Sequence, residues 1–263
     1  MPIALKLALA PVLVAQAVGT RRRAPVLPEA AGPREGTLPA AGAPLHVLLA
    51  GDSSAAGVGV AHQDQALAGH FSRALQRAVQ RPVHWRLVAH TGLNTQQVHA
   101  LLRAQARHAA GEGEIAVVVS GVNDLITLVS PRRAVQHRAA LADWLLGELG
   151  IAHVVFAPLP PVHRFPLLPQ PLRRVMGDDA RAHDAALARW AATRGDVSHL
   201  PIAIDLGPES MAVDGFHPGE PVYRICGEAL AAHVARLSVS LNARPGTHPS
   251  THPSTHQTRG EAR

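Results

Sequence analysis

The chain has 263 residues, of which 47 % are hydrophobic and 17 % charged, so it is long enough for one α/β domain of about 200 residues with extensions. Its single cysteine, Cys226, excludes an intramolecular disulfide and a cysteine-based zinc site. The formal charge of +6 comes from scattered Arg residues and only 3 % of the residues are aromatic, so we expect no nucleic-acid partner.

The N-terminal segment, residues 3–19, is apolar apart from Lys6 and Gln16, and three Arg follow it at 21–23. Its length of seventeen residues is the lower limit for a bilayer span. The positive charge follows the apolar run, which is the wrong flank for a secretory signal and would hold that end in the cytoplasm. Three interpretations of residues 1–23 remain: a helix that associates with or spans a membrane, which is preferred, an amphipathic helix packed on the domain, and a cleaved signal.

Residues 24–44 are rich in proline and glycine and have no apolar period, which predicts a linker or an arm lying on the surface. From Leu45 onward, apolar runs of strand length alternate with helical patterns. The expected strands are 45–50, 83–89, 115–120, 152–157 and 199–204, and the expected helices are 66–80, 95–108, 132–149, 177–194 and 220–237. This alternation predicts a three-layer α/β/α domain over residues 45–240, with a five-stranded parallel sheet of flavodoxin-like order 2-1-3-4-5.

Two segments interrupt the alternation. Pro158–Pro171 contains six prolines, cannot be helical, and would overhang the carboxyl edge of the sheet as a loop. Residues 241–263 contain a Thr-His-Pro-Ser repeat that has no core-forming residue, which predicts a disordered tail. Its His248, His252 and His256 could bind a metal weakly, but a solvated tail is the better interpretation, and we expect no metal site.

The first expected strand runs directly into Gly51-Asp52-Ser53, which places a serine hydroxyl at the carboxyl edge of the sheet, where ligands bind in open α/β folds. A glycine-rich turn after a strand could also cradle a phosphate. However, Gly51 to Gly59 lacks both the P-loop lysine and the spacing of the dinucleotide fingerprint. A serine nucleophile needs a base, an orienting group and oxyanion donors. We expect Asp52 to brace the turn.

A base and its orienting group could both come from the end of the chain. Asp214 and His217 lie three residues apart around Gly215, so the carboxylate could reach one imidazole nitrogen and leave the other facing Ser53. The same spacing suits a helix N-cap Asp followed by a surface His, and Pro218 fits that interpretation equally well. The pattern alone leaves both interpretations open.

Oxyanion donors could come from the residues that follow two other strands. Asn123 could donate its side-chain amide, and Gly92 lets the backbone approach a ligand and donate its N–H. Each by itself is equally an ordinary turn residue. His90 and His99 flank the turn at Gly92 and could line the cleft, and His163 in the proline-rich loop could contact a substrate.

Taken together, these positions resemble the SGNH/GDSL hydrolases, a family of serine esterases and lipases. The resemblance spans about residues 45–237 and rests on four blocks in family order: Gly51-Asp52-Ser53 with Gly57, then Gly92, then Gly121-x-Asn123-Asp124, then Asp214-x-x-His217-Pro218. It implies Ser53, rather than its neighbour Ser54, as nucleophile. It implies His217 as general base and Asp214 as its partner. It also implies an oxyanion hole made by the N–H groups of Ser53 and Gly92 and the side-chain amide of Asn123.

The resemblance further implies a carboxylic ester hydrolase that works through an acyl-enzyme and uses no metal or organic cofactor. The proline-rich loop is similar to one in a bacterial subgroup, so we expect a bacterial protein. The N-terminal segment and the Arg residues after it predict a protein that is cytoplasmic or associated with the inner membrane, in preference to one secreted by a cleaved signal. In that loop, His163, Phe165 and Leu167 are the expected substrate contacts.

The substrate class stays open on the sequence alone. The apolar loop and the N-terminal segment favour a lipid-like or acyl ester such as a lysophospholipid, and a carbohydrate O-acetyl ester is the alternative. The expected partners are a small-molecule ester and a membrane surface contacted through residues 3–23, and the oligomeric state is undetermined. A catalytically silent, membrane-attached relative is a further alternative, against which the intact nucleophile, base and oxyanion positions count.

Overall fold

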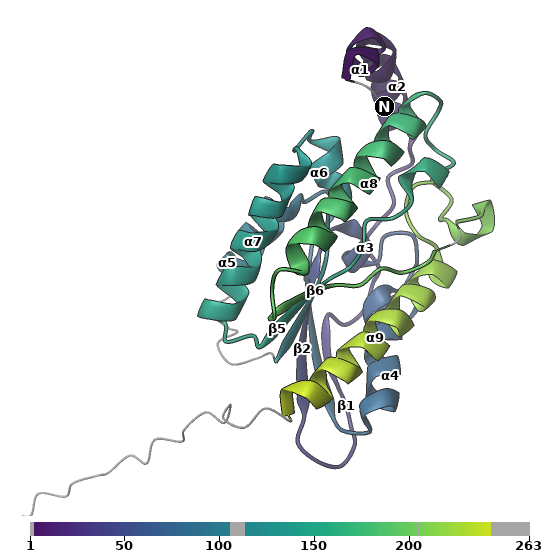
Figure 1. Cartoon of the computed structure of the whole chain (residues 1–263). Helices are drawn as coiled ribbons and strands as arrows, with labels where there is room; N and C mark the ends of the chain where they lie inside the picture. The colour runs from purple at the N-terminus through teal and green to yellow at the C-terminus, as the bar shows by residue number, and fades with distance from the viewer. Residues whose placement is uncertain (1–2, 106–113, 205, 243–263) are drawn as a thin grey trace, which may run out of the picture.

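The computed structural model describes residues 3–105, 114–204 and 206–242 (Figure 1). At its centre lies a six-stranded sheet of order β1-β3-β2-β4-β5-β6. The strands are β1 (Glu35–Leu38), β2 (Leu45–Gly51), β3 (Val83–Ala89), β4 (Ile115–Val119), β5 (His153–Phe156) and β6 (Val197–His199). β2 to β6 are parallel and follow the predicted order 2-1-3-4-5, which confirms the fold class. The predicted tail lies outside the described residues beyond residue 242.

The sixth strand was not predicted and corrects the expected strand count. β1 lies in the segment expected to be a linker or arm, and it pairs antiparallel with β3, from Glu35 opposite Arg86 to Leu38 opposite Val83. Its residues alternate between exposed and half-buried, and a Cβ on Gly36 would lie 3.0 Å from the Trp85 ring. An edge strand that contributes mainly backbone pairing leaves little hydrophobic pattern to detect.

The last strand is shorter and earlier than the predicted range 199–204. β6 ends at His199, and the apolar residues that follow leave the sheet. Pro201 has no N–H with which to continue a ladder. Ile202 and Ile204 line an apolar cavity near the sheet edge, so their hydrophobicity reflects that cavity.

Helices cover both faces of the sheet, as predicted for parallel strands (Figure 1). They are α3 (Ser53–Ala56), α4 (Leu67–Val79), α5 (Thr95–Gln105), α6 (Val122–Ile126), α7 (Pro131–Glu148), α8 (Leu172–Ala191) and α9 (Glu220–Asn242), with short 3-10 turns η1 (Gln63–Gln65), η3 (Val162–Arg164) and η4 (Pro208–Ser210). α8 begins five residues before the predicted 177, because Leu172 and Val175 are buried although two Arg lie between them. The part of the predicted helix 95–108 beyond residue 105 lies outside the described residues.

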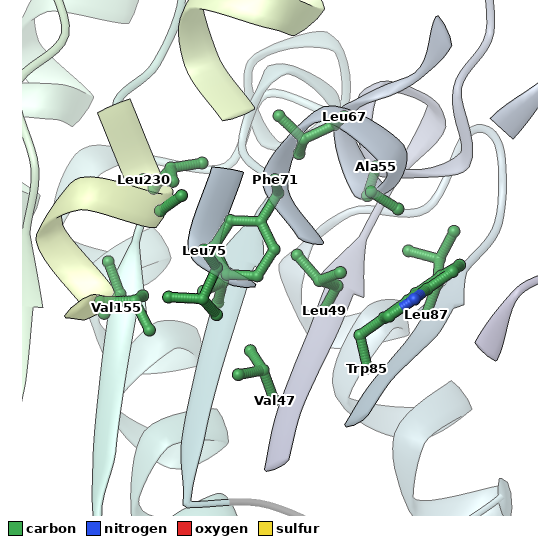
Figure 2. Packing of buried hydrophobic residues seen from close by; sticks show 14 of the residues in the cluster. Val47, Leu49, Ala55, Leu67, Phe71, Leu75, Trp85, Leu87, Val155 and Leu230 are labelled. Carbon is green, nitrogen blue, oxygen red and sulfur yellow. The ribbon is translucent and has the colours of Figure 1, made fainter. Parts of the chain in front are cut away.

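The core is divided by the sheet into two apolar layers. Successive side chains of a strand point to opposite faces, and Val47 and Leu49 of β2 pack with α4 and α9 on one face. Figure 2 shows Phe71 and Leu75 of α4 and Leu230 of α9 over these strand residues. Alternate residues of β2 pack with α5, α7 and α8 on the other face. Burial on both faces explains the near-continuous apolar runs from which the strands were predicted.

The N-terminal residues form α1 (Ile3–Ala8) and α2 (Ala10–Arg23), which lie at the end of α8 (Figure 1). Lys6 pairs with Asp179 of α8. Gln16 donates to the carbonyl of Gln170 at 2.6 Å and accepts from the N–H of Leu172 at 3.1 Å. Within residues 3–105, 114–204 and 206–242, none of the helices has the length and hydropathy needed to cross a bilayer.

Candidate active site

Ser53 lies at the point where β2 gives way to α3, at the carboxyl edge of the sheet. Gly51 ends β2 so close to β4 that a Cβ there would lie 2.1 Å from the carbonyl oxygen of Val119. Asp52 caps α3 by accepting from the N–H of Ser54 at 3.0 Å, as its expected bracing role requires. Gly57, with φ of 81°, ends the short helix in a left-handed turn. The sequence Gly51 to Gly57 therefore fixes the backbone that presents the Ser53 side chain.

Asp214 and His217 lie next to Ser53, although they follow it by more than 160 residues. Nε2 of His217 lies 3.1 Å from Oγ of Ser53, and Nδ1 lies 2.5 Å from Oδ2 of Asp214. The other carboxylate oxygen of Asp214 accepts from the N–H groups of Phe216 and His217, both at 2.9 Å. Gly215 makes the tight turn possible with φ of 62°. The structure thus brings together the three residues expected to form the triad.

Two buried carboxylates at this site differ in their protonation behaviour. Burial acts to raise the pKa of Asp214, but the hydrogen bonds from the His217 ring and from the N–H groups of His217 and Phe216 outweigh it and hold the pKa below its usual range. At Asp52, burial dominates over the N–H groups of Ser54 and Gly121 and raises the pKa to about 6. Asp214 is therefore the carboxylate that stays ionised beside the imidazole.

The two remaining sequence-predicted donors lie on the elements that flank Ser53. Asn123 is in the first turn of α6, lines the same cavity as Ser53, and donates through Nδ2 to the carbonyl of Leu93 at 3.0 Å. Gly92 lies in the turn after β3, the strand beside β2, and has φ of 83°. The N–H of His90 donates to the carbonyl of Gly51 at 3.3 Å, so this turn starts beside the strand that leads to Ser53.

A buried ion pair between Asp124 and Arg138 connects the segment after Gly92 to the helix that carries Asn123, and it was not predicted from the sequence. Oδ1 and Oδ2 of Asp124 accept from the N–H and the hydroxyl of Thr95, at 3.2 and 2.6 Å. Arg138 of α7 lies 3.3 Å from Asp124, and both side chains are fully buried. A Cβ on Gly121 would lie 2.5 Å from the Arg138 guanidinium, so glycine is needed there. Arg138 gave no signal because a charged residue in a helical pattern is normally solvated.

An apolar cavity of about 80 Å³ opens beside the Ser53 hydroxyl. It extends from the sheet edge toward α9, and its walls are formed mainly by apolar side chains, among them Leu67, Val119, Phe165, Ile202, Ile204, Leu206, Met211, Phe216, Val222, Cys226 and Leu230. Such a pocket can hold an apolar group while the hydroxyl and imidazole face its entrance. Among the described residues, no group of three or more His, Cys, Asp or Glu side chains could hold a metal ion.

Of the three expected substrate contacts, one lines the cavity and two do not. Phe165 lines the cavity and packs edge-on against Phe216, with ring centroids 5.2 Å apart. His163 instead lies against Gly177 and Arg181 of α8, away from the cavity lining. Leu167 does not line the cavity either, but its N–H donates to the carbonyl of Gly215 at 3.1 Å and so supports the turn between Asp214 and His217.

The two histidines near Gly92 also lie outside the cavity lining. His90 is exposed and pairs with Glu29 at 3.1 Å, and His99 packs beside the Trp144 ring, with centroids 5.4 Å apart. Glu29 lies in residues 24–44, here called the N-terminal arm, and no sequence pattern indicated that it would reach this turn. A single Glu in a proline-rich segment has no pattern that distinguishes it from a solvated residue.

The three-layer fold, with a Ser–His–Asp constellation at the carboxyl edge of a parallel sheet, defines an SGNH-type hydrolase. The chain belongs to the GDSL-like Lipase/Acylhydrolase family, whose profile it matches over residues 49–225, and it is accordingly a carboxylic ester hydrolase. No curated protein sequence matches the chain.

Solved structures of similar fold cover most of the domain at low sequence identity. The lipase Lip_vut3 from a goat rumen metagenome is 17 % identical, with a TM-score of 0.58 over 72 % of this chain and 96 % of that one. A Clostridium thermocellum family 3 carbohydrate esterase is 15 % identical, with a TM-score of 0.58 over 74 % and 99 %. The inhibitor-bound M. smegmatis aryl esterase is 18 % identical, with a TM-score of 0.54 over 73 % and 99 %. These likenesses establish the shared fold.

Proposed function

We propose that the protein cleaves carboxylic esters through an acyl-enzyme formed on Ser53. The observation that carries this proposal is the continuous hydrogen-bonded chain from Ser53 through His217 to Asp214, with separations of 3.1 and 2.5 Å. A serine hydroxyl is a weak nucleophile until a base takes its proton, and an imidazole held by an ionised carboxylate is such a base. The lowered pKa of Asp214 supports its role as that carboxylate.

In the proposed reaction, Nε2 of His217 accepts the hydroxyl proton while Oγ of Ser53 bonds to the ester carbonyl carbon. The carbonyl electron pair moves to oxygen, where the N–H groups of Ser53 and Gly92 and the amide of Asn123 would stabilise the negative charge. When the intermediate collapses, the bond to the alcohol oxygen breaks and His217 returns the proton to it. Water then loses a proton to His217, its oxygen bonds to the acyl carbon, and Oγ leaves and regains that proton.

The apolar cavity supports a substrate with an apolar acyl group, such as a lysophospholipid or another lipid-like ester. Its walls beyond Ser53 and His217 are mostly hydrocarbon, which suits the burial of such a group. A sugar O-acetyl ester remains the alternative, because the family's fold also occurs in a carbohydrate esterase.

The first experiment measures hydrolysis of p-nitrophenyl esters from acetyl to dodecanoyl by the wild type, Ser53→Ala, His217→Ala and the neighbouring control Ser54→Ala. We expect losses of about 10⁴-fold or more for the first two variants and a small effect for the control. We also expect kcat/KM to rise with chain length until the cavity is filled. Equal rates for wild type and Ser53→Ala would refute the proposed nucleophile, and a strong acetyl preference would favour the carbohydrate alternative.

A fluorophosphonate probe tests the remaining alternative of a catalytically silent protein. Labelling of the wild type but not of Ser53→Ala would show an activated hydroxyl. Absence of both labelling and hydrolysis would instead support the silent, membrane-attached alternative.

A membrane surface is the second partner that we propose. α2 leaves Val14 and Val18 exposed one turn apart, at 62 % and 45 %, and its last turn carries three Arg at 21–23. Exposed apolar residues followed by basic residues suit the surface of an anionic bilayer. Cosedimentation with phosphatidylserine vesicles should exceed that with phosphatidylcholine and should fall for Val14→Asp. Equal recovery with and without vesicles would refute this contact.

A further inference from the structure

The turn that carries Gly92 is held on its outer side by one carboxylate from the N-terminal arm. Oε1 of Glu29 accepts from the N–H of Thr91 at 2.7 Å and from its hydroxyl at 2.8 Å, and it lies 3.1 Å from Nδ1 of His90. Glu29 therefore contacts both residues that immediately precede Gly92, although more than sixty positions separate them in the sequence.

Arg34 extends this contact to the end of β3. It forms an ion pair with Oε2 of Glu29, and its NH1 donates to the carbonyl of Ala89 at 2.7 Å. The carbonyl of Arg34 also accepts from the N–H of Leu87 at 2.6 Å. Glu29 and Arg34 together thus hold the last three residues of β3, 87–89, and the first two residues after the strand.

The same arm is bonded to the helix that begins at Ser53. The N–H of Ala30 donates to the carbonyl of Ala56 at 3.2 Å, and Nε2 of Gln63 donates to the carbonyls of both residues at 3.2 and 3.1 Å. The Cβ of Ala30 lies 2.7 Å from where a Cβ on Gly57 would be, so the arm packs directly on the end of α3. Residues 29 and 30 therefore connect the segment that follows Ser53 to the segment that precedes Gly92.

This connection matters because two of the proposed oxyanion donors are backbone N–H groups on different elements. The direction of the Gly92 N–H is set by the φ and ψ of Thr91, and Glu29 restrains Thr91 at both its backbone nitrogen and its side chain. The hydrogen bonds from Thr91 hold the pKa of Glu29 below its usual range, against the effect of burial, which keeps the side chain an anionic acceptor.

We propose that Glu29 is a positioning residue for the oxyanion hole, which holds the Gly92 N–H in register with the Ser53 N–H. The proposal rests on the proposed function, in which both groups stabilise the tetrahedral intermediate. It assigns Glu29 a role without contact to the substrate. Donors must lie about 2.7–3.1 Å from the developing oxyanion, so loss of this restraint should weaken transition-state binding more than ground-state binding.

The test compares Glu29→Ala and Glu29→Gln with the control Glu35→Ala, which removes an exposed carboxylate from β1 of the same arm. We expect kcat for a p-nitrophenyl ester to fall about 10- to 100-fold in Glu29→Ala, less than the full loss of an oxyanion donor, with KM within about twofold of wild type. Glu29→Gln keeps an acceptor for Thr91 and should recover part of the loss. Glu35→Ala should behave as wild type.

A second readout isolates the oxyanion hole. An alkyl boronic acid forms an anionic tetrahedral adduct with a serine hydroxyl, so its affinity should fall in parallel with kcat in Glu29→Ala. Thr91→Val removes only the hydroxyl contact and should give a smaller loss of the same kind. It also serves as the test variant if Glu29→Ala fails to fold. Amide hydrogen exchange in the segment after β3 should be faster in Glu29→Ala, a result that requires no substrate.

Three results would overturn the proposal: wild-type kcat in Glu29→Ala or, if that variant does not fold, in Thr91→Val; a loss confined to KM; or an equal loss in Glu35→Ala. These outcomes differ from failure of the proposed function, in which Ser53→Ala would retain wild-type activity. In that event hydrogen exchange alone would decide whether Glu29 restrains the turn, and unchanged exchange would refute it.

Discussion

The two sides of the active site are held in place in different ways. On one side, the proposed base His217 and its partner Asp214 form an acid–base flank, in which the hydrogen bonds to the Asp214 carboxylate all lie within four consecutive residues. On the other, the proposed oxyanion donors Gly92 and Asn123 form an oxyanion flank, which is supported by Glu29 from the N-terminal arm and by the pair of Asp124 in α6 with Arg138 in α7. We therefore expect that substitutions in the acid–base flank can abolish catalytic activity without lowering the stability of the fold. In the oxyanion flank, substitutions of the supporting residues should lower catalytic activity and stability together.

Asp214→Asn should have the largest effect on activity. An amide at this position leaves the geometry in place but cannot favour the imidazole tautomer that accepts the Ser53 proton, so we expect kcat to fall by about 10⁴-fold. The thermal midpoint should change little. Steady-state kinetics and a thermal melt of the same preparation measure both quantities.

Asp52→Asn is the matched control, because it neutralises a second buried carboxylate in the same site without touching the imidazole. It should retain most of the wild-type kcat. If both variants lost activity equally, general electrostatics of the pocket, and not the contact between Asp214 and His217, would explain the effect.

Asp124→Ala should cause the largest loss of stability. It would leave the Arg138 guanidinium buried and unpaired, which we expect to cost about 3–5 kcal/mol in the free energy of unfolding. Activity should fall as well, because the hydrogen bonds that join Thr95 to α6, the helix that carries Asn123, are lost. Denaturant unfolding with parallel kinetics would measure both.

The double variant Asp124→Leu with Arg138→Met sharpens this prediction. Replacing the whole pair by apolar groups should restore most of the stability while activity stays low. Recovery of activity together with stability would mean that the ion pair contributes only to folding and does not position Asn123.

The pH dependence of stability should report Asp52. Burial raises its pKa to about 6 in the folded protein from the ordinary value of 3.8, so the folded state binds the proton more tightly than the unfolded state does. The contribution of Asp52 to stability is therefore fully present below the unfolded pKa and is lost as pH rises toward about 6, by about 3 kcal/mol at most.

Asp52→Asn removes this titration. Relative to wild type, the variant should become progressively more stable as pH rises from about 4 to about 7. Unfolding curves at four or five pH values measure the difference. A difference that is independent of pH would show that Asp52 titrates alike in the folded and unfolded chain.

Cys226→Leu should have the smallest effect. The thiol lines the cavity, and the added volume should shorten the space for an acyl chain, so kcat/KM for long-chain esters should fall about 10-fold relative to acetyl ester. Activity on the acetyl ester serves as the internal control. An unchanged chain-length profile would place the acyl group outside this cavity.

The Ser53 turn could be predicted from local residues. The local pattern of Asp214 and His217 left two interpretations open, and the resemblance to the SGNH/GDSL hydrolases decided between them. Gly51, Asp52 and Gly57 define one backbone path, and Asp214, Gly215 and His217 define another. The parallel sheet was predicted because strands buried on both faces appear as continuous apolar runs.

The supports of the oxyanion flank could not be predicted. Glu29 and Arg138 act across long sequence separations, and a lone charged residue has no periodicity that distinguishes an inward from a solvated position. β1 was not predicted because it contributes mainly backbone pairing. Ile202 and Ile204 were wrongly assigned to a strand because the residues that line an apolar cavity have the same composition as a buried strand.

The contacts of the N-terminal arm determine which residues a fragment must include if the domain is to be transferred into another protein. A fragment beginning at Leu45 would contain the matched family region and every residue of the triad. It would nevertheless lack β1, leaving the edge of β3 unpaired, and it would lack Glu29 beside Thr91. To graft this domain into another protein, or to exchange it with a relative, the cut should therefore fall before Glu29.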